Sequence, residues 1–537
     1  MARVLLINPS YKACYGATKA SLAIPIFPTL GLATIAATLL ERGHGVTIED
    51  MSYEAYDPGR VRDLIRRTRA DLVGISGTTP LFNQARDISL IAKKISENIL
   101  VVAGGSHVSA LPVESLLESR MDAVVRGEGD YTICDIADGL PFERIPGITY
   151  RKSDGTVAAT GARPMTESLN DLPFPAWHLY DSRIYKHKVT KLIAKRSPIV
   201  MMEFSRGCVF RCDFCASKNT MGLGYRKKSP ERIADEMEYA YKLGYREVTL
   251  ADDIFTSDNQ WAVAVCEEIM RRKIDMAWTC TNGIRVESAD DKLFTTMRRA
   301  GCYRVAFGFE TGNDEVLRKF GKGGRATIEQ GKTAVKAARR AGMDTSGCFL
   351  LGLSPDTEAT MMDTIRYARE LELDMLKFGI TIAFPGTPMF QEYRKKGLLR
   401  TYNWDHYEVY TDQDLYTHER LPFETIQRYM KIAYERAIIG NPRFLLRRLK
   451  RGIRTGEFFW DAFYFMKYLF LPNVNSGSSR IPYAHEAEWP RFDFEKTREL
   501  SAIEYQQPQS HDWRKLQYTP KDVDEMVKRL KPAPAYA

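Results

Sequence analysis

Short, uninterrupted apolar runs alternate with longer stretches of helical periodicity through the first third of the chain. The apolar runs cover residues 4–7, 46–48, 72–75, 99–102 and 123–125. Helical spacing extends over residues 32–41, with Gly43 at the place of a C-cap glycine, and over residues 84–95. Strands that are apolar on both faces are typical of parallel sheets covered by helices. The pattern therefore predicts an α/β domain with a doubly wound parallel sheet over residues 1–150.

Small and polar residues follow these strands, where the carboxyl ends of a parallel sheet would meet. They are Ser76, Thr78, Gly104, Gly105, Gly127 and Glu128. Any one of these loops could be an ordinary turn, but several on one edge favour a large ligand that approaches the backbone closely. No G-x-G-x-x-G opens a helix and no G-x-x-x-x-G-K-[ST] is present, which argues against a dinucleotide or a nucleoside triphosphate.

Strand and helix patterns alternate again in the second third. Strand-like runs cover residues 247–250, 277–279, 304–307, 348–351 and 378–382, and one more precedes Cys208. The spacing indicates six β/α units, whose functional residues lie at the strand carboxyl ends. The polar residues at those ends are Asp252, Asp253, Asn282, Arg285, Glu310 and Thr311. Each of them could instead be a helix-capping or surface residue.

Composition narrows the class of protein. The chain has 537 residues, 44% of them hydrophobic, and a net charge of +9, which fits a folded protein of two to four domains. Nine cysteines are too few for a disulfide scaffold in a chain of this length. No run of 18 apolar residues exists, and the N-terminus is typical of a strand and not of a signal peptide. We expect a cytoplasmic protein whose thiols are free for metal or redox chemistry.

Three cysteines fall within eight residues, with the spacing C-x3-C-x2-C: Cys208, Cys212 and Cys215. Soft thiolates so close together favour zinc or an iron–sulfur cluster. A structural zinc site needs four protein ligands, and the closest downstream cysteine is Cys266. Three ligands on a cubane cluster would leave one iron open to a substrate. A structural trio of buried thiols is the alternative.

This stretch resembles the radical S-adenosylmethionine (SAM) enzymes, whose motif has an aromatic residue, here Phe214, before the last cysteine. The resemblance implies that Cys208, Cys212 and Cys215 hold a [4Fe-4S] cluster whose open iron binds SAM. It implies a partial (β/α)6 barrel over residues 196–395. It also implies that the polar residues at the barrel strand ends, Asp252 to Thr311, contact SAM.

A doubly wound domain before such a barrel resembles the cobalamin-binding class of radical SAM enzymes. The loops Pro28–Gly31, 104–107 and 126–129 match that class, as does the linker segment 172–177 within residues 151–195. The resemblance implies that the sheet-edge residues, Ser76 to Glu128, contact cobalamin. The D-x-H-x-x-G sequence that supplies histidine to cobalt is absent, since neither His44 nor His107 follows an Asp by two residues. We therefore expect cobalamin to bind without histidine ligation.

The class suggests a function. We expect methylation of an unactivated carbon through methylcobalamin and a 5′-deoxyadenosyl radical, on a small-molecule or lipid-like substrate. A flavodoxin- or ferredoxin-type donor of low potential would supply electrons. A cobalamin-dependent radical SAM cyclase or oxidative enzyme is one alternative, and a non-catalytic corrinoid-binding regulator is another. A second cluster is not expected, because the N-terminal half has only Cys14 and Cys134 and no cysteine follows Cys348.

Residues 396–537 read as a mainly helical region with a polar tail. Helical spacing covers residues 423–439. Residues 443–472 hold seven basic and two acidic side chains, a net charge of +5, with aromatic residues interleaved. They could form a helical pair on the barrel with a solvated basic face, or a peripheral membrane contact. No nucleic-acid partner is expected, because no binding module accompanies the charge.

Overall fold

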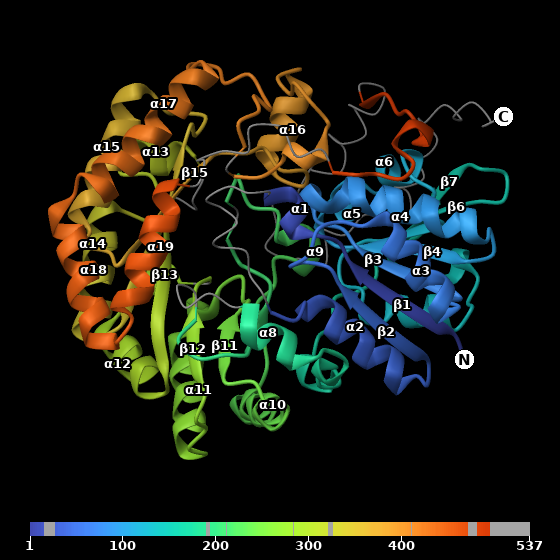
Figure 1. Ribbon diagram of the computed structural model, residues 1–537, viewed down its shortest axis with the longest axis horizontal. Coiled ribbons are helices and arrows are strands. Elements are labelled where there is room, and N and C mark those ends of the chain that lie inside the picture. Colours follow the sequence, from blue (N-terminus) through green and yellow to red (C-terminus); the bar gives the residue numbers. More distant parts are fainter. Residues whose placement is uncertain are drawn as a thin grey trace.

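The first sheet lies in the N-terminal half of the computed structural model (Figure 1). The structure describes residues 1–15, 27–188, 194–210, 212–282, 284–320, 326–409, 411–470 and 481–494. The sheet order is β2 (Gly45–Asp50), β1 (Arg3–Asn8), β3 (Leu72–Ser76), β4 (Leu100–Gly104), β5 (Ala123–Val125), β6 (Ile148–Arg151) and β7 (Val157–Ala159). The first five strands are parallel, and β6 and β7 extend the sheet in antiparallel fashion. We therefore propose that this unit extends to Ala159.

Helices cover both faces of this sheet, which confirms the doubly wound arrangement. Leu5 and Ile7 of β1 pack with α3 (Pro58–Thr68) and α4 (Phe82–Ile95). Val4 and Leu6 pack on the other face with α2 (Leu30–Glu41) and α7 (Thr132–Ala137). Successive side chains of a strand point to opposite faces, so a continuous apolar run is what such a buried strand requires.

The second sheet is the barrel. Its strands follow one another in chain order, all parallel: β8 (Ile199–Met202), β11 (Glu247–Leu250), β12 (Ala277–Cys280), β13 (Cys302–Glu310), β14 (Asp344–Leu351) and β15 (Met375–Ile380). Among the described residues β8 and β15 do not pair with each other, so the barrel is open. The helices that follow its strands are α10 (Pro230–Lys242), α11 (Asn259–Arg271), α12 (Asp291–Arg299), α14 (Ile328–Arg340) and α15 (Glu358–Glu370). At the start of α10, the Ser229 hydroxyl accepts from the Arg232 N–H at 3.1 Å, as an N-cap residue does.

The C-terminal region is helical and packs on the barrel. It comprises α17 (Phe423–Tyr434), which continues as a π-helical turn over Glu435–Ile439, then α18 (Pro442–Thr455) and α19 (Phe458–Phe470). α17 contacts β15 and α15. In the part of the chain that the structure describes, no helix combines the length and the apolar character that a membrane crossing needs.

Residues 481–494 return to the N-terminal sheet (Figure 1). The buried carboxylate of Asp87 in α4 accepts from the backbone N–H groups of Ala484 and His485, each at 3.0 Å. The Trp489 ring lies 4.3 Å from the Arg86 guanidinium. The Phe494 carbonyl accepts from Arg394 of α16 (Pro388–Lys395) at 2.8 Å, so this segment contacts both halves of the molecule. The rest of the polar tail, residues 495–537, lies outside the described residues.

A buried carboxyl in this region makes stability depend on pH. Burial raises the pKa of Glu118 to about 7, although Arg86 at 3.4 Å opposes the shift. Below the unfolded value of 4.5 the group is protonated in both states, and from there to about pH 7 only the unfolded chain ionises. As the pH rises from 4.5 to about 7, the free energy of unfolding should therefore fall by about 3 kcal/mol relative to that of the Glu118→Gln variant. Urea unfolding of both proteins at pH 4.5 and pH 8 checks this, and a constant difference between them would contradict it.

Candidate functional site

The loops after β3 and β4 contact each other directly. The Gly77 N–H donates to the Gly104 carbonyl at 2.7 Å, and the His107 N–H donates to the Gly77 carbonyl at 3.0 Å. Gly105 has φ +115°, and a Cβ there would lie 2.9 Å from the Gly77 carbonyl oxygen. The packing of two loops therefore already requires glycine at this position, independently of any ligand.

The other predicted residues of this edge are held by local hydrogen bonds. Ser76 is the last residue of β3 and lies in register with Gly104. The hydroxyl groups of Thr78 and Tyr11 lie 3.4 Å apart. Gly127, with φ +75°, donates its N–H to the Ser109 hydroxyl at 3.1 Å. Hydrogen bonds within and between these loops thus fix the backbone of the edge.

This edge faces the cysteine loop. The helix after β4, α5 (Ser106–Ala110), contacts α9 (Lys218–Met221), which directly follows the three cysteines. A Cβ on Gly127 would lie 3.8 Å from the Thr220 carbonyl oxygen of α9. The structure therefore brings the two predicted cofactor sites, which lie far apart in the sequence, to one place.

Both histidines that were considered as cobalt ligands have contacts within the protein. His107 is buried, its ring stacks on Phe82 at 4.1 Å, and burial lowers its pKa to about 3. His44 precedes β2 and so lies at the opposite edge of the sheet, where its Nε2 is 3.0 Å from Asp138. Cobalamin binding without histidine ligation stays a prediction.

The cysteine loop is held at both ends by a short antiparallel pair. β9 (Ser205–Arg206) leads into the loop, and β10 (Arg226–Lys227) pairs with it after α9. Farther along, the Phe214 ring stacks on Phe320 at 5.4 Å, and the Asp213 carbonyl accepts from the Met389 N–H at 3.2 Å. The loop is therefore fixed to the last part of the barrel as well as to its first strand.

The three cysteines are the candidate ligands of the cluster. All three are half-buried and form no disulfide. Burial, with Asp253 and the other two thiols nearby, raises the pKa of Cys208 to about 12, so its thiolate needs a cation. Among the described residues no three side chains converge on one metal ion. In an iron–sulfur cluster each cysteine binds a different iron, so such convergence is not required.

Gly207, just before Cys208, gives a test of this loop. It has φ +83°, and a Cβ would lie 2.0 Å from the Gly224 carbonyl oxygen. We expect Gly207→Ala to displace the loop and to lower the iron bound per protein severalfold after anaerobic reconstitution. Gly155→Ala is the matched control, because Gly155 has φ +82° with nothing within 4 Å and adds only the left-handed penalty of about 1–2 kcal/mol. Equal iron content in the two variants would contradict the expectation.

Asp252 and Asp253 follow β11 and reach toward the cysteine loop. Asp252 is buried and accepts from the Phe204 N–H at 2.7 Å and from the Ser205 hydroxyl, and burial raises its pKa to about 7. Burial also raises the pKa of Asp253, while hydrogen bonds from the Gly207 backbone and the Ser217 side chain lower it. Both carboxyls thus position the strand and the loop around Cys208.

The remaining strand-end residues differ in what they contact. Arg285 lies with its guanidinium 3.7 Å from the Phe210 ring in the cysteine loop, and the Asn282 carbonyl accepts from the Cys280 thiol at 3.0 Å. Glu310 is buried with φ +61°, a strained conformation for a residue other than glycine. Thr311 turns away, and its hydroxyl is 3.0 Å from that of Thr364 in α15. Thr311 is therefore held by α15, one of the helices that surround the barrel strands.

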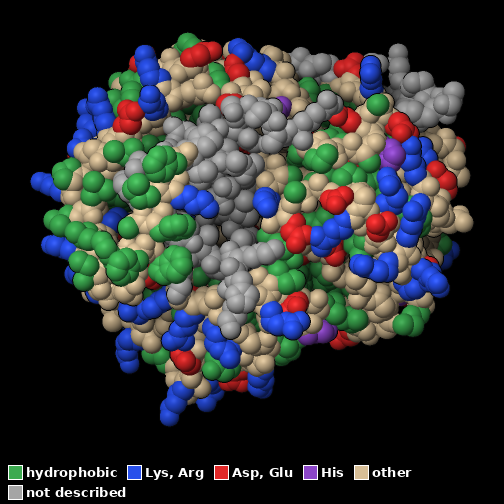
Figure 2. Space-filling view, viewed as in Figure 1, with side chains coloured by type: hydrophobic (Ala, Val, Ile, Leu, Met, Phe, Trp, Pro, Cys, Tyr) green, Lys and Arg blue, Asp and Glu red, His purple; other side chains and the backbone are tan. Residues whose placement is uncertain are grey.

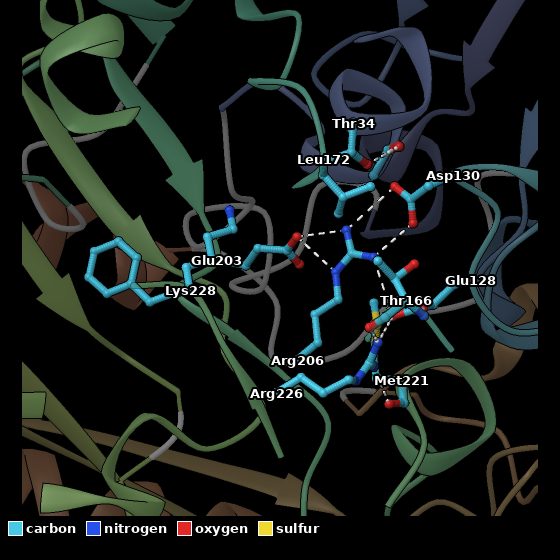
Figure 3. Close-up of polar contacts among 12 residues, drawn as sticks. Thr34, Glu128, Asp130, Thr166, Leu172, Glu203, Arg206, Met221, Arg226 and Lys228 are labelled. Atoms are coloured by element: carbon cyan, nitrogen blue, oxygen red, sulfur yellow. Dashed lines mark hydrogen bonds and ion pairs between the residues drawn. The ribbon is translucent and has the colours of Figure 1, made fainter. Parts of the chain in front are cut away.

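A buried ionic network links the loop after β5 to the β9–β10 pair, and no local sequence pattern indicates it (Figure 3). Arg206 of β9 lies 2.7 Å from Asp130, 2.7 Å from Glu203 and 3.3 Å from Glu128, and only 4% of its side chain is exposed. Arg226 binds Glu128 at 2.8 Å. Burial alone would lower the pKa of Arg206, but the three carboxylates raise it well above its usual value. We call these five residues the interdomain network.

The interdomain network changes the interpretation of Glu128. Its carboxylate also accepts from the Thr166 N–H at 2.8 Å, so three donors engage it. In the sequence, only the positions of these residues beside the two predicted cofactor loops could have indicated the network. Arg206 directly precedes the Gly207–Cys208 pair, and Glu128 lies in the Gly127–Gly129 loop. Glu128 thus links the sheet edge to the strand that carries the cysteine loop.

Comparison with known proteins agrees with this geometry. A B12 binding domain model matches residues 24–137, over the first sheet, and a radical SAM superfamily model matches residues 202–368, over the barrel. An uncharacterized methyltransferase of Pyrococcus horikoshii is 31% identical over 442 residues, which cover 79% of this chain and 93% of that protein. The chain is a B12-dependent radical SAM enzyme.

Other similar proteins agree with the assignment. The anaerobic magnesium-protoporphyrin IX monomethyl ester cyclase of Rubrivivax gelatinosus is 27% identical over 477 residues, covering 84% of this chain and 83% of that protein. The solved structure of the methyltransferase TsrM from Kitasatospora setae, with cobalamin and a [4Fe-4S] cluster bound, has a TM-score of 0.59 at 19% identity and covers 74% of this chain and 78% of that one. This likeness shows a shared fold.

Membership of this family assigns three cofactors to the enzyme: a [4Fe-4S] cluster, SAM and cobalamin. The three cysteines of one loop, which form no disulfide, fit the cluster, and the glycine-containing loops at the sheet edge fit close approach of a corrin. Radical SAM enzymes act on small molecules and need a reductant, so this B12-dependent radical SAM enzyme does too.

Proposed function

We propose that the enzyme methylates an unactivated carbon of a small, apolar or lipid-like molecule. The observation that carries the proposal is the contact between the edge of the first sheet and α9 beside the cysteine loop. A methyl donor at that edge and a radical source at that loop would meet in one place. Proximity of this kind, with water excluded, is what the reaction needs from the protein.

Each group of residues has a proposed role. Cys208, Cys212 and Cys215 hold the cluster. The strand-end side chains Asp252, Asp253, Asn282, Arg285 and Glu310 surround SAM, whereas Thr311, whose hydroxyl lies 3.0 Å from that of Thr364, positions the end of β13 beside them. The sheet-edge residues Ser76, Thr78, Gly104, Gly105 and Gly127 receive cobalamin, whereas Glu128 positions that edge through Arg206 and Arg226. When bound, these cofactors supply a hydrogen-abstracting radical and a methyl group, and the protein supplies their placement.

A cobalamin-dependent cyclase is the second candidate. It is favoured by the cyclase relative, which aligns over 84% of this chain. Such an enzyme would use the same geometry without net methyl transfer. For either reaction we propose a low-potential electron donor of the flavodoxin or ferredoxin type. An apolar substrate would come from a lipid surface, so the proposal includes a peripheral contact between the enzyme and a membrane.

The substrate and the reaction can be sought together. The anaerobically purified holoenzyme is incubated with a reductant, cell extract and SAM that carries a deuterated methyl group. We expect one extract component to gain the mass of a deuterated methyl group. If no component gains the label but one component loses hydrogen or closes a ring, the result would favour the cyclase instead.

A further inference from the structure

The helix pair α18–α19 presents its apolar side to the outside of the molecule. Figure 2 shows hydrophobic side chains gathered over these two helices. Ile453 is 68% exposed, Phe459 80% and Phe470 81%. Most exposed apolar residues of the pair follow helical spacing, namely Leu445, Leu446, Leu449 and Ile453 on α18, and Phe459, Phe463, Met466 and Phe470 on α19; Phe458 and Trp460 at the start of α19 are exposed as well. They form one apolar face, which we call the α18–α19 face.

The charged side of α18 turns inward. Arg451 has a side chain that is 5% exposed and lies 2.8 Å from Asp344 of β14. Arg448 lies 2.6 Å from Asp461 of α19. The sequence interpretation with a solvated basic face is therefore wrong for these arginines. A helix on a globular core normally places its apolar stripe against that core, so α18 is inverted.

This inversion requires that something cover the apolar face. Monomeric proteins rarely expose a large contiguous apolar surface, and such surfaces mark contacts with proteins or membranes. The two acidic residues of the pair are already used inside, since Glu457 lies 2.9 Å from Arg451 and Asp461 pairs with Arg448. Both acidic side chains are only 15% exposed, so they contribute little to the outer surface of the pair.

The exposed charges of the pair are cationic. They are Arg443, Lys450, Arg454 and Lys467. An apolar face flanked by basic side chains complements a bilayer with anionic headgroups, because the aromatic rings reach the acyl boundary and the long cations reach the phosphates. A second copy of the chain is a poorer occupant, since a symmetric pairing would place only cations against cations.

We propose that the α18–α19 face docks the enzyme on an anionic lipid bilayer. The inference rests on the proposed function in one respect: docking would let an apolar substrate enter the enzyme from that bilayer. The binding itself follows from the exposed apolar residues and the cations beside them. It needs no membrane-spanning helix.

Flotation of the full-length holoenzyme with vesicles tests the proposal. One set of vesicles is phosphatidylcholine alone, and the other is an equimolar mixture of phosphatidylcholine and phosphatidylglycerol. We expect binding to the anionic vesicles at least tenfold tighter than to the neutral ones, and weaker binding in high salt. Failure to bind the anionic vesicles, or equal binding to both sets, would overturn the proposal.

Two double variants separate the apolar and the charged contributions. Phe459→Ser with Phe470→Ser removes two exposed rings, and Lys450→Glu with Lys467→Glu reverses two charges. Each should weaken binding about tenfold or more. The controls are Leu140→Ser, which is 41% exposed in the N-terminal half, and Lys152→Glu in the same half, and neither should change binding. Equal losses in variants and controls would overturn the proposal.

The remaining outcomes also decide. If the lipid-free enzyme dimerises and the double phenylalanine variant makes it monomeric, the face is a protein interface and the proposal fails. SAM cleavage without substrate should stay unchanged in all four variants, which shows that they are folded. Vesicle binding is measured without turnover, so a negative flotation result would contradict the docking and leave the proposed reaction untouched. Likewise, a failure to detect methylation would leave the docking untouched.

Discussion

Replacing Cys212 with alanine is expected to abolish the visible absorbance of the cluster and the reductive cleavage of SAM. The three thiols of one loop are the proposed cluster ligands, and two thiolates hold a cubane too weakly to leave a single open iron. The measurement is iron and sulfide content together with 5′-deoxyadenosine formed after anaerobic reconstitution. Cobalamin loading should persist, because the first sheet is a separate unit, and this shows that the variant is folded.

Cys266→Ala is the control for that experiment. Cys266 is buried in α11 among apolar side chains, so its loss should cost only about 1 kcal/mol of stability and leave the cluster intact. SAM cleavage at the normal rate in Cys212→Ala would show that the three cysteines are structural. It would favour the corrinoid-binding regulator.

The second large effect is expected at Arg206, in the interdomain network. Arg206→Met leaves Asp130, Glu203 and Glu128 buried with too little positive charge near them. Breaking a buried ionic network from one side destabilises a protein by about 3–5 kcal/mol. We expect that loss in the free energy of unfolding, measured by urea denaturation. The cysteine loop and the first sheet should also lose their fixed separation, so more SAM should be cleaved without methyl transfer.

Two comparisons isolate the network. Arg3→Met breaks an ion pair with Asp71 in which the side chains are 56% and 46% exposed, so it should lower the free energy of unfolding far less than Arg206→Met does. Adding Asp130→Asn to Arg206→Met removes one uncompensated carboxylate and should restore part of the stability. A loss in Arg206→Met no larger than in Arg3→Met would contradict the role of the network.

The sequence predicted the strands well, because apolar runs buried on both faces are a local property. β1 to β5 and the six barrel strands all overlap the apolar runs from which they were predicted. The cysteine spacing was equally informative, since three ligands in one loop need no tertiary contact to be recognised. These features depend on residues that are close together in the chain.

The features that the sequence could not predict depend on residues far apart in the chain. Arg206 and Asp130 are 76 positions apart, and nothing local pairs them. Periodicity predicts an apolar and a basic stripe on α18, but it does not predict which of them faces the barrel. The basic stripe faces inward because Arg451 pairs with Asp344 of β14. The need for glycine at 105 similarly comes from Gly77 in another loop.

The central claim is that one site holds a radical source and a methyl donor. The most direct test counts the products of SAM during turnover with the substrate found in extract. Methylation through both cofactors predicts S-adenosylhomocysteine and 5′-deoxyadenosine in equal amounts. Formation of 5′-deoxyadenosine with no S-adenosylhomocysteine would contradict the methyltransferase assignment.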